Sequence, residues 1–202
     1  MASVGVLSYQ GGYARHLELL QQLGYTALPV RSVEALEPVH ALIIPGGEST
    51  TIGMLLERFG VLDALLRRIA DGLPVFGTCA GAILLATGIE GSDQPRIGAL
   101  DITVRRNAYG RQIDSFEADT RPAAGANASV LSDEPFRGVF IRAPQIVRTG
   151  PGVTTILEHE DRPVLVRQGR LLAATFHPEL SGDDRIHRYF LSQVAGLGPT
   201  LP

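Results

Sequence analysis

The chain has 202 residues, a formal net charge of −3 and a pI near 5.9, so it lacks the strong positive charge expected of a nucleic-acid or anionic-membrane binder. Hydrophobic residues make up 45% and charged residues 19% of the chain, as in an ordinary globular protein with a sizeable core. The single cysteine excludes a disulfide within the chain and fits a reducing cytoplasm. We expect one α/β domain over residues 1–202, with no signal peptide and no membrane span.

Apolar, strand-like runs alternate with helical patterns in the first half of the chain. Ser32 is placed to cap the start of one helix, and Gly24 to cap the end of another. The alternation predicts a doubly wound, mostly parallel sheet with right-handed crossovers. The expected strands cover residues 4–7, 27–30, 41–44 and 75–76, and the expected helices cover residues 13–23, 32–36, 51–70 (a pair) and 80–86.

Shorter strand-like segments follow in the second half and indicate an antiparallel extension of the same sheet. A stretch rich in Ala, Gly, Asn and Pro at 121–133 predicts a surface loop. Asp183 or Asp184 is expected to cap a last helix that reaches about Val194, before a flexible tail over about 196–202. The expected strands of this half cover residues 102–105, 116–119, 139–141, 146–147, 154–157, 164–167 and 171–176.

A sharp turn is expected where the strand at 75–76 meets the helix at 80–86, and Cys79 lies at that turn. Gly77 and Gly81 flank it two residues away on either side, the spacing of a nucleophile elbow. A lone cysteine is usually a small buried hydrophobe. However, a core cysteine needs neither a turn nor two glycines beside it. We therefore predict a nucleophile at a helix N-terminus, where the thiolate is favoured.

His177 is the best candidate for the base that such a nucleophile needs. It follows the apolar run at 171–176, so it should emerge at the same sheet edge as Cys79. Glu179 lies two residues on, and extended backbone through Pro178 would put both side chains on one face, where the carboxylate fixes the imidazole tautomer. The alternative is a His-Pro-Glu surface loop, which is less favoured beside a cysteine elbow. The remaining histidines are assigned structural roles: His16, His40, His159 and His187.

A turn of sequence Pro-Gly-Gly-Glu-Ser at 45–49 follows the strand at 41–44. Three interpretations remain open. The turn binds an anion, although it lacks the lysine of a P-loop; it is a plain tight turn; or the N–H groups of Gly47 and Ala80 form an oxyanion hole. This turn, the turn at Gln10 and Cys79 all follow strand ends, so one sheet edge should hold them together.

These residues resemble a known family. The Gly-Thr-Cys-Ala-Gly elbow with His-Pro-Glu resembles class I glutamine amidotransferases, and further segments resemble the glutaminase subunits of pyridoxal 5′-phosphate synthase (the PdxT/SNO family) over about residues 4–194. The resemblance implies a flavodoxin-like glutamine amidotransferase fold, glutaminase activity, and no metal or cofactor. It also implies a TIM-barrel synthase partner in a hetero-oligomeric complex, which receives the ammonia. The further segments are Gln10-Gly11 and residues 45–51, 105–112, 114–117 and 140–144.

The resemblance also implies roles for single residues. Cys79 would attack the side-chain amide of L-glutamine, and His177 and Glu179 would complete the triad. Gly47 and Ala80 would form the oxyanion hole, and Gln10 would take part in activation by the partner. The substrate-binding residues that the resemblance implies are Gly47, Glu48, Ser49, Arg106, Ile141 and Arg142.

Three other functions remain as alternatives. The first is a glutaminase that feeds another synthase, such as imidazole glycerol phosphate synthase; it would differ at residues 105–112 and 140–144. The second is a non-catalytic binding module of the same fold, whose sequence should have lost Cys79 or His177. The third is a cysteine peptidase, against which the arginine pair and the Gly-Gly-Glu-Ser turn argue, because they suit a small amino acid.

Overall fold

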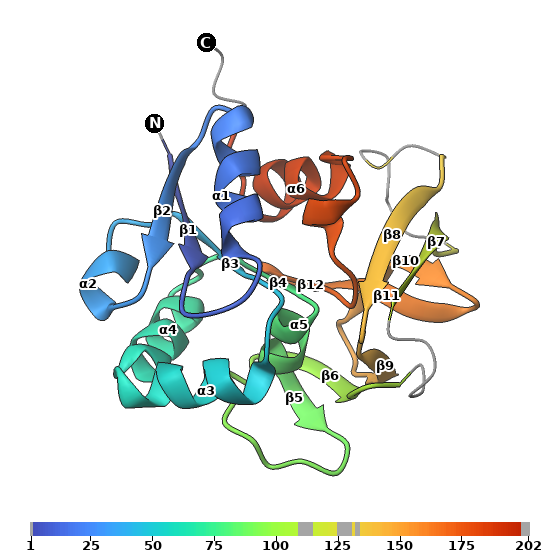
Figure 1. Cartoon of the computed structure of the whole chain (residues 1–202), viewed down its shortest axis with the longest axis horizontal. Coiled ribbons are helices and arrows are strands. Elements are labelled where there is room, and N and C mark those ends of the chain that lie inside the picture. Colours follow the sequence, from blue (N-terminus) through green and yellow to red (C-terminus); the bar gives the residue numbers. More distant parts are fainter. Residues whose placement is uncertain (1, 109–114, 125–130, 132–133, 199–202) are drawn as a thin grey trace.

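The structure, a computed structural model, describes residues 2–108, 115–124, 131 and 134–198. The first half of the chain folds into alternating strands and helices (Figure 1). Five parallel strands lie side by side in the order β2 (Thr26–Val30), β1 (Ser3–Leu7), β3 (Ala41–Ile44), β4 (Val75–Thr78) and β12 (Leu171–Ala174). The helices between them are α1 (Tyr13–Gln22), α2 (Val33–Leu36), α3 (Ser49–Arg58), α4 (Val61–Ala70) and α5 (Ala80–Leu85). The doubly wound prediction is confirmed.

Four further strands continue the same sheet beyond β12, each antiparallel to its neighbour. They are β11 (Arg162–Gln168), β10 (Thr154–His159), β7 (Ser115–Pro122) and β8 (Phe136–Ile141). The predicted antiparallel extension is therefore confirmed for these segments. It is wrong for β6 (Leu100–Arg105) and β9 (Gln145–Thr149), which form a separate three-stranded sheet with β5 (Ala86–Ile89). The alternation of apolar residues along a strand reveals its buried face, but not which strand pairs with it.

The strand β5 replaces the end of a helix that was expected to reach Ala86. In a continued helix, the carbonyl oxygen of Leu84 would accept from the N–H of Gly88. Instead it accepts from the N–H groups of Ile97 (2.8 Å) and Gly98 (3.1 Å). This tertiary contact ends the helix at Leu85, and the poor helix formers Thr87 and Gly88 do not oppose it.

The two faces of the large sheet carry separate apolar cores. Along β3, Leu42 and Ile44 pack with α2, α3, α4 and α5, whereas Ala41 and Ile43 pack with α1 and α6 (Arg185–Tyr189). The small sheet lies on the first of these faces, as Figure 1 shows. This burial on both sides explains why the parallel strands read as uninterrupted apolar runs. It also leaves the carboxyl edge of these strands as the place where polar side chains emerge.

The end of the chain departs from the expected pattern in detail. Asp184 precedes α6 as expected, but Asp183 supplies the capping oxygen, accepting from the Arg185 N–H at 3.0 Å. The helix continues as a π-helical turn, Phe190–Val194. The strand expected at 171–176 ends at Ala174.

The loop predicted at 121–133 begins later than expected. Arg121 and Pro122 still pair with β10, and the Ala123 N–H donates to the Ile156 carbonyl oxygen at 3.0 Å. The start of that prediction is therefore wrong, because the ladder of β7 extends further than its apolar pattern. Residues 125–130, 132 and 133 lie outside the described residues.

The predicted flexible tail is only partly covered by the structure. The Tyr25 hydroxyl donates to the carbonyl oxygens of Leu197 (3.2 Å) and Gly198 (3.0 Å), and residues 199–202 lie outside the described residues. A flexible tail and a single domain over 1–202 remain predictions. Within the described part of the chain, no helix combines the length and apolar character needed to cross a bilayer.

Candidate active site

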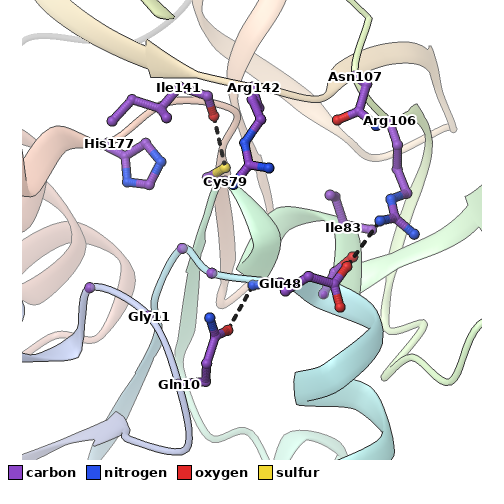
Figure 2. A pocket seen from close by; sticks show the side chains of 14 residues that line it. Gln10, Gly11, Glu48, Cys79, Ile83, Arg106, Asn107, Ile141, Arg142 and His177 are labelled. Atoms are coloured by element: carbon purple, nitrogen blue, oxygen red, sulfur yellow. Dashed lines mark hydrogen bonds and ion pairs between the residues drawn. The ribbon is translucent and has the colours of Figure 1, made fainter. Parts of the chain in front are cut away.

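A cavity of about 330 Å³ opens at the carboxyl edge of the parallel strands. It brings together the turns that follow β1, β3 and β4 with His177 beyond β12, as expected for strand ends that share one edge (Figure 2). Nine of the predicted site residues line it, while Ala80 and Glu179 are buried just behind. The lining residues are Gln10, Gly11, Gly12, Gly46, Gly47, Glu48, Ser49, Cys79, Ile83, Arg106, Asn107, Ile141, Arg142 and His177.

Cys79 occupies the corner between β4 and α5 with an unusual backbone conformation, φ 47° and ψ −101°. A non-glycine residue held at positive φ costs about 1–3 kcal/mol and persists only where its surroundings enforce it. The Cys79 N–H donates to the Ala174 carbonyl oxygen at 2.8 Å, which ties the corner to β12. A side chain at Gly77 would collide with the backbone of Gly81, and one at Gly81 with the carbonyl of Ile44. The two glycines therefore let the elbow pack against the sheet, as predicted.

His177 and Glu179 meet as predicted, but the reason given for it was wrong. The His177 Nδ1 lies 2.7 Å from the Glu179 Oε1. The backbone between them is not extended, because Pro178–Leu180 forms one turn of 3₁₀ helix. Proline is well suited to the first position of such a turn, since it lacks the N–H that a helix start leaves unpaired. The His177 N–H donates to the Val139 carbonyl oxygen at 2.8 Å, so β8 fixes the start of the turn.

The electrostatics of the pair favour a charged imidazole. Burial alone would lower the pKa of His177, but the hydrogen bonds and negative charges of Cys79 and Glu179 outweigh it and raise this pKa to about 10. Burial would raise the pKa of Glu179, yet the hydrogen bond from His177 and the charge of that imidazolium lower it. With Nδ1 held by Glu179, the Nε2 of His177 is the atom left to serve Cys79.

The turns at Gln10 and Gly46 pack backbone against backbone. The Gly12 N–H donates to the Gly46 carbonyl oxygen at 3.0 Å, and the Gln10 Oε1 accepts from the Glu48 N–H at 2.7 Å. Gly11 has φ 95°, and a side chain there would overlap the Gly46 carbonyl. The peptide groups beside Gly47 are thus held by Gln10, a side chain that is itself exposed. These two hydrogen bonds tie the turn after β3 to the turn after β1.

The two arginines of the cavity differ in how they are held. Arg106 contacts Glu48 (3.0 Å), Gln94 (2.6 Å) and Thr50 (3.1 Å). Arg142 is exposed and has no hydrogen bond or ion pair within the described residues. Arg142 is therefore the guanidinium with free donors at the cavity (Figure 2).

Glu48 is both a helix cap and a cavity residue. Its Oε2 accepts from the N–H (2.8 Å) and hydroxyl (3.0 Å) of Thr51, and its Oε1 faces Arg106. Burial would raise its pKa, but these hydrogen bonds and the Arg106 charge lower it. Glu48 is thus a carboxylate at the cavity mouth. Ser49 is buried, and its hydroxyl donates to the Gln94 Oε1 at 3.3 Å.

Three residues beside the site were missed or left structural in the sequence. Gln94 is buried and accepts from Ser49, Thr50 and Arg106 through one oxygen. His16 and His187, which were predicted to be structural, are both fully buried behind Glu179. The His16–His187 contact joins positions 171 residues apart, and no local pattern signals such a pairing.

Positive φ angles concentrate around the cavity. Besides Cys79, they occur at Asn107 (φ 49°) and Arg142 (φ 42°), which both line it, whereas the other two described non-glycine cases, Glu160 and Asp161, lie in the turn between β10 and β11. Backbone strain of this kind clusters at functional sites. Of the segment 105–112 that carried part of the resemblance, residues 109–112 lie outside the described residues, as does Asp114. Within the described chain, no cluster of three or more His, Cys, Asp or Glu side chains could hold a metal ion.

Comparison with known proteins decides the family. The model of the SNO glutamine amidotransferase family matches residues 6–196. The chain belongs to this family. "Pyridoxal 5'-phosphate synthase subunit PdxT" of Pelotomaculum thermopropionicum is 53% identical over 195 residues, covering 96% of both chains. The protein of the same name from Thermus thermophilus is 53% identical over 196 residues, covering 96% of this chain and 98% of the relative. The resemblance found in the sequence is therefore confirmed.

Solved structures agree with the family assignment. A crystal structure described as a glutamine amidotransferase superimposes with a TM-score of 0.87 at 51% identity, covering 96% of this chain and 98% of that one. A putative GMP synthase protein from Thermoplasma acidophilum superimposes with a TM-score of 0.69 at 18% identity, over 97% and 95% of the two chains. The second likeness shows the fold alone. Together they confirm the α/β glutamine amidotransferase fold of this family member.

Proposed function

We propose that the chain is a glutaminase that hydrolyses L-glutamine to L-glutamate and ammonia. The observation that carries the proposal is the single thiol, Cys79, at a strained corner of one cavity with the paired His177 and Glu179. Cysteine nucleophiles in acyl transfer need a base, an orienter for that base and donors for the oxyanion. Membership in a glutamine amidotransferase family supports this chemistry against the peptidase alternative.

In the first half-reaction, the Cys79 thiolate adds to the side-chain carbonyl carbon of glutamine, and the C=O electron pair moves to oxygen. The N–H groups of Gly47 and Ala80 are proposed to donate to this oxyanion. When the oxyanion collapses, the C–N bond breaks, and the His177 imidazolium gives its Nε2 proton to the departing nitrogen. The products are ammonia and a γ-glutamyl thioester on Cys79.

In the second half-reaction, water attacks the thioester carbonyl while His177, now neutral, takes its proton. The second oxyanion collapses with cleavage of the C–S bond, which releases glutamate and restores the thiolate beside the imidazolium. Glu179 stays ionised throughout and stabilises the imidazolium at each stage. The raised pKa of His177 suits this cycle, because it keeps the proton donor charged at neutral pH.

The mouth of the cavity offers charges of both signs, as a free amino acid requires. We assign the substrate α-carboxylate to Arg142, which has no hydrogen bond or ion pair within the described residues, together with Arg106, which also lines the cavity. Glu48 is proposed to receive the α-ammonium group. Gly47, Ser49 and Ile141 complete the proposed glutamine site, since all three line the cavity.

We further propose that the ammonia passes to a TIM-barrel subunit of pyridoxal 5′-phosphate synthase within a hetero-oligomeric complex in the cytoplasm. Two relatives at 53% identity that carry the name of this synthase support the assignment. A protected route has a physical reason, because free ammonia becomes ammonium in bulk water. Gln10 is proposed to gate activity, since its exposed side chain holds the Glu48 N–H beside the Gly47 turn. No cofactor or metal is required by this chemistry.

The test is glutamate release from glutamine, measured with and without the synthase subunit, for wild type and Cys79→Ala. We expect strong stimulation by the synthase subunit, and a loss of about 10⁴-fold or more in kcat for Cys79→Ala, because the nucleophile is gone. A Cys79-dependent activity that ignores this partner would point to another synthase, such as imidazole glycerol phosphate synthase. Absence of glutamate under every condition would contradict the proposal and favour a binding module.

A further inference from the structure

A line of buried polar groups continues behind the catalytic pair into the core. The Glu179 Oε1 faces His177, and its Oε2 lies 3.4 Å from the His16 Nε2. The His16 Nδ1 in turn lies 3.0 Å from the His187 Nε2. His16 and His187 are completely buried, and the Glu179 side chain is 1% exposed. This line runs from α6 through α1 to the 3₁₀ turn that carries Glu179.

His16 is the polar partner available to the second carboxylate oxygen. Within the described residues, the Glu179 Oε2 makes no hydrogen bond, and the His16 imidazole is the ionisable group that lies close to it. The 3.4 Å separation is slightly longer than a typical hydrogen bond. Burying a carboxylate oxygen without a hydrogen-bond donor destabilises the folded state. An imidazole N–H this close to the oxygen reduces that cost.

The hydrogen-bond partners decide which tautomer each histidine adopts. If His16 carries its proton on Nε2, it donates to Glu179, and its Nδ1 accepts from the His187 Nε2–H. The His187 Nδ1, which has no partner in the described chain, then holds only a lone pair. An unpaired buried acceptor is tolerated better than an unpaired buried donor.

If both rings instead carry their protons on Nδ1, two contacts become unfavourable. The His16 Nε2 lone pair would face the Glu179 carboxylate, although Thr78 Oγ1, 3.4 Å away, could donate to it. In addition, His187 would carry an N–H on Nδ1 that no described group accepts. Burial lowers the pKa of His16 and lowers that of His187 well below its usual range, so both rings are neutral at pH 7. The Nε2–H tautomer of both is therefore favoured.

We propose that His16 is a positioning residue: its Nε2–H, oriented by His187, holds the Glu179 carboxylate in the plane that pairs with His177. The kinetic consequence rests on the proposed glutaminase activity, whereas the hydrogen bonds themselves do not. Without the donor, Glu179 Oε2 is left unpaired in an apolar core, and the carboxylate turns or takes up a proton. Either change weakens the His177 imidazolium that supports the Cys79 thiolate.

Ionisable groups from several elements of the described chain face this line. His177 and His16 face Glu179 directly, and the cavity on its outer side has a volume of about 160 Å³. His187 has His16 as its ionisable neighbour, and Phe76 meets its ring edge-on. The charged residues that line the outer cavity beside Glu179 are Arg15, Glu18 and Asp183.

The test compares two near-isosteric unbranched replacements, His16→Gln and His16→Met. Glutamine keeps an N–H donor for Glu179 and an acceptor for His187, whereas methionine keeps neither. Leu20→Ala is the control for simple destabilisation, because Leu20 is buried one helical turn further along α1 in the same core. Each variant is assayed for glutaminase kinetics with the synthase partner and for iodoacetamide alkylation across pH. The alkylation reports on Cys79 alone, because the chain has a single cysteine.

We expect His16→Met to lower kcat about 10- to 100-fold with KM within about twofold, the scale of one hydrogen bond to a charged group. Its alkylation at pH 7 should be slower than that of wild type. His16→Gln should stay within about threefold of wild type in both assays. Leu20→Ala should lower Tm but leave kcat and the alkylation profile in place.

Three results would overturn the proposal. The first is a wild-type alkylation profile and kcat in His16→Met. The second is an equal loss in His16→Gln and His16→Met. The third comes from ¹⁵N NMR of the wild-type histidines, which should show His16 as the Nε2–H tautomer at pH 7; the Nδ1–H tautomer would contradict it. If wild type releases no glutamate while the Gln and Met variants still differ in alkylation, the proposed function fails and the positioning role stands.

Discussion

On one side of the cavity, Cys79 and His177 are fixed by backbone hydrogen bonds to neighbouring strands, at Ala174 and Val139. Glu179 is buried behind them. By contrast, Glu48 and Arg142 are exposed side chains on the turns that follow β3 and β8, and the exposed Gln10 side chain accepts from the Glu48 N–H. The sheet therefore fixes the groups that would react, whereas turns carry the groups that would recognise the substrate.

This contrast predicts different kinetic effects for substitutions in the two groups of residues. Groups held by the sheet do not need to move when a ligand enters, so changing them should affect the chemical step and kcat. Groups on exposed turns contact the ends of the substrate, so changing them should affect KM. The turn side also touches bulk solvent, which makes it the side that a docking partner reaches. Substitutions on each side can test whether this division holds.

The largest effect is expected for Glu179→Gln on the sheet side. The amide keeps the shape but removes the charge that stabilises the His177 imidazolium, so kcat should fall about 10³- to 10⁴-fold. The pKa of His177 is raised to about 10, so its proton is present at neutral pH and is lost as the pH rises through about 10. Removing the carboxylate lowers this pKa, and the basic limb of kcat against pH should move to lower pH.

The measurement is a pH–rate profile of glutamate release for wild type and Glu179→Gln, with the synthase subunit present. A matched control is Glu18→Gln, which removes a carboxylate from the exposed face of α1, beside the separate outer cavity that Glu179 also lines. Glu18→Gln should keep the wild-type profile. A basic limb that stays near pH 10 in Glu179→Gln would show that the carboxylate does not set the His177 charge.

The sheet side was also the more predictable part of the sequence. Cys79 is marked by glycines two residues away, and His177 and Glu179 follow an apolar run, so local spacing placed all three. The turn of 3₁₀ helix between them was not foreseen, because two side chains can meet through more than one backbone path. No local sequence pattern could identify the role of His16, because its contact with His187 joins residues that are 171 positions apart.

The fold shows the same limit on a larger scale. Alternating helices and apolar runs predict the parallel half, because each crossover must return to the same sheet. In the second half, the strand segments were found but two were assigned to the wrong sheet. β6 pairs with β5, and β9 pairs with the other edge of β6. The strand β5 forms because the N–H groups of Ile97 and Gly98 donate to the Leu84 carbonyl oxygen that a longer α5 would use. Such a competition is decided by tertiary contacts alone.

An intermediate effect is expected for Gly46→Ala, where the turn after β3 packs against the turn after β1. A Cβ at Gly46 would overlap the His177 Cε1, and the imidazole cannot yield without losing its 2.7 Å contact with Glu179. We expect kcat to fall about 100-fold, since misplacing a catalytic group by about 1 Å costs on that order. Glutaminase kinetics and Tm are measured together.

Gly12→Ala is the matched control on the facing turn. Its backbone has φ −78°, which alanine adopts freely, and its Cβ would meet only the Glu179 Oε1 at 3.5 Å, an ordinary contact. We expect wild-type kcat within about threefold and an unchanged or slightly higher Tm. Equal losses of kcat in Gly46→Ala and Gly12→Ala would mean that the substitutions disturb the packing of the two turns and not the His177 imidazole.

The smallest effect is expected on the turn side, for Arg142→Gln compared with Arg106→Gln. Arg142 has no partner in the described chain, so its loss should raise KM for glutamine about tenfold and leave kcat and Tm near wild type. Arg106 donates to the buried Gln94, so Arg106→Gln should lower Tm as well as raise KM. Steady-state kinetics and thermal melts separate the two. An unchanged KM in Arg142→Gln would indicate that Arg106, and not Arg142, binds the substrate carboxylate. It would also contradict the division between residues that react and residues that bind the substrate.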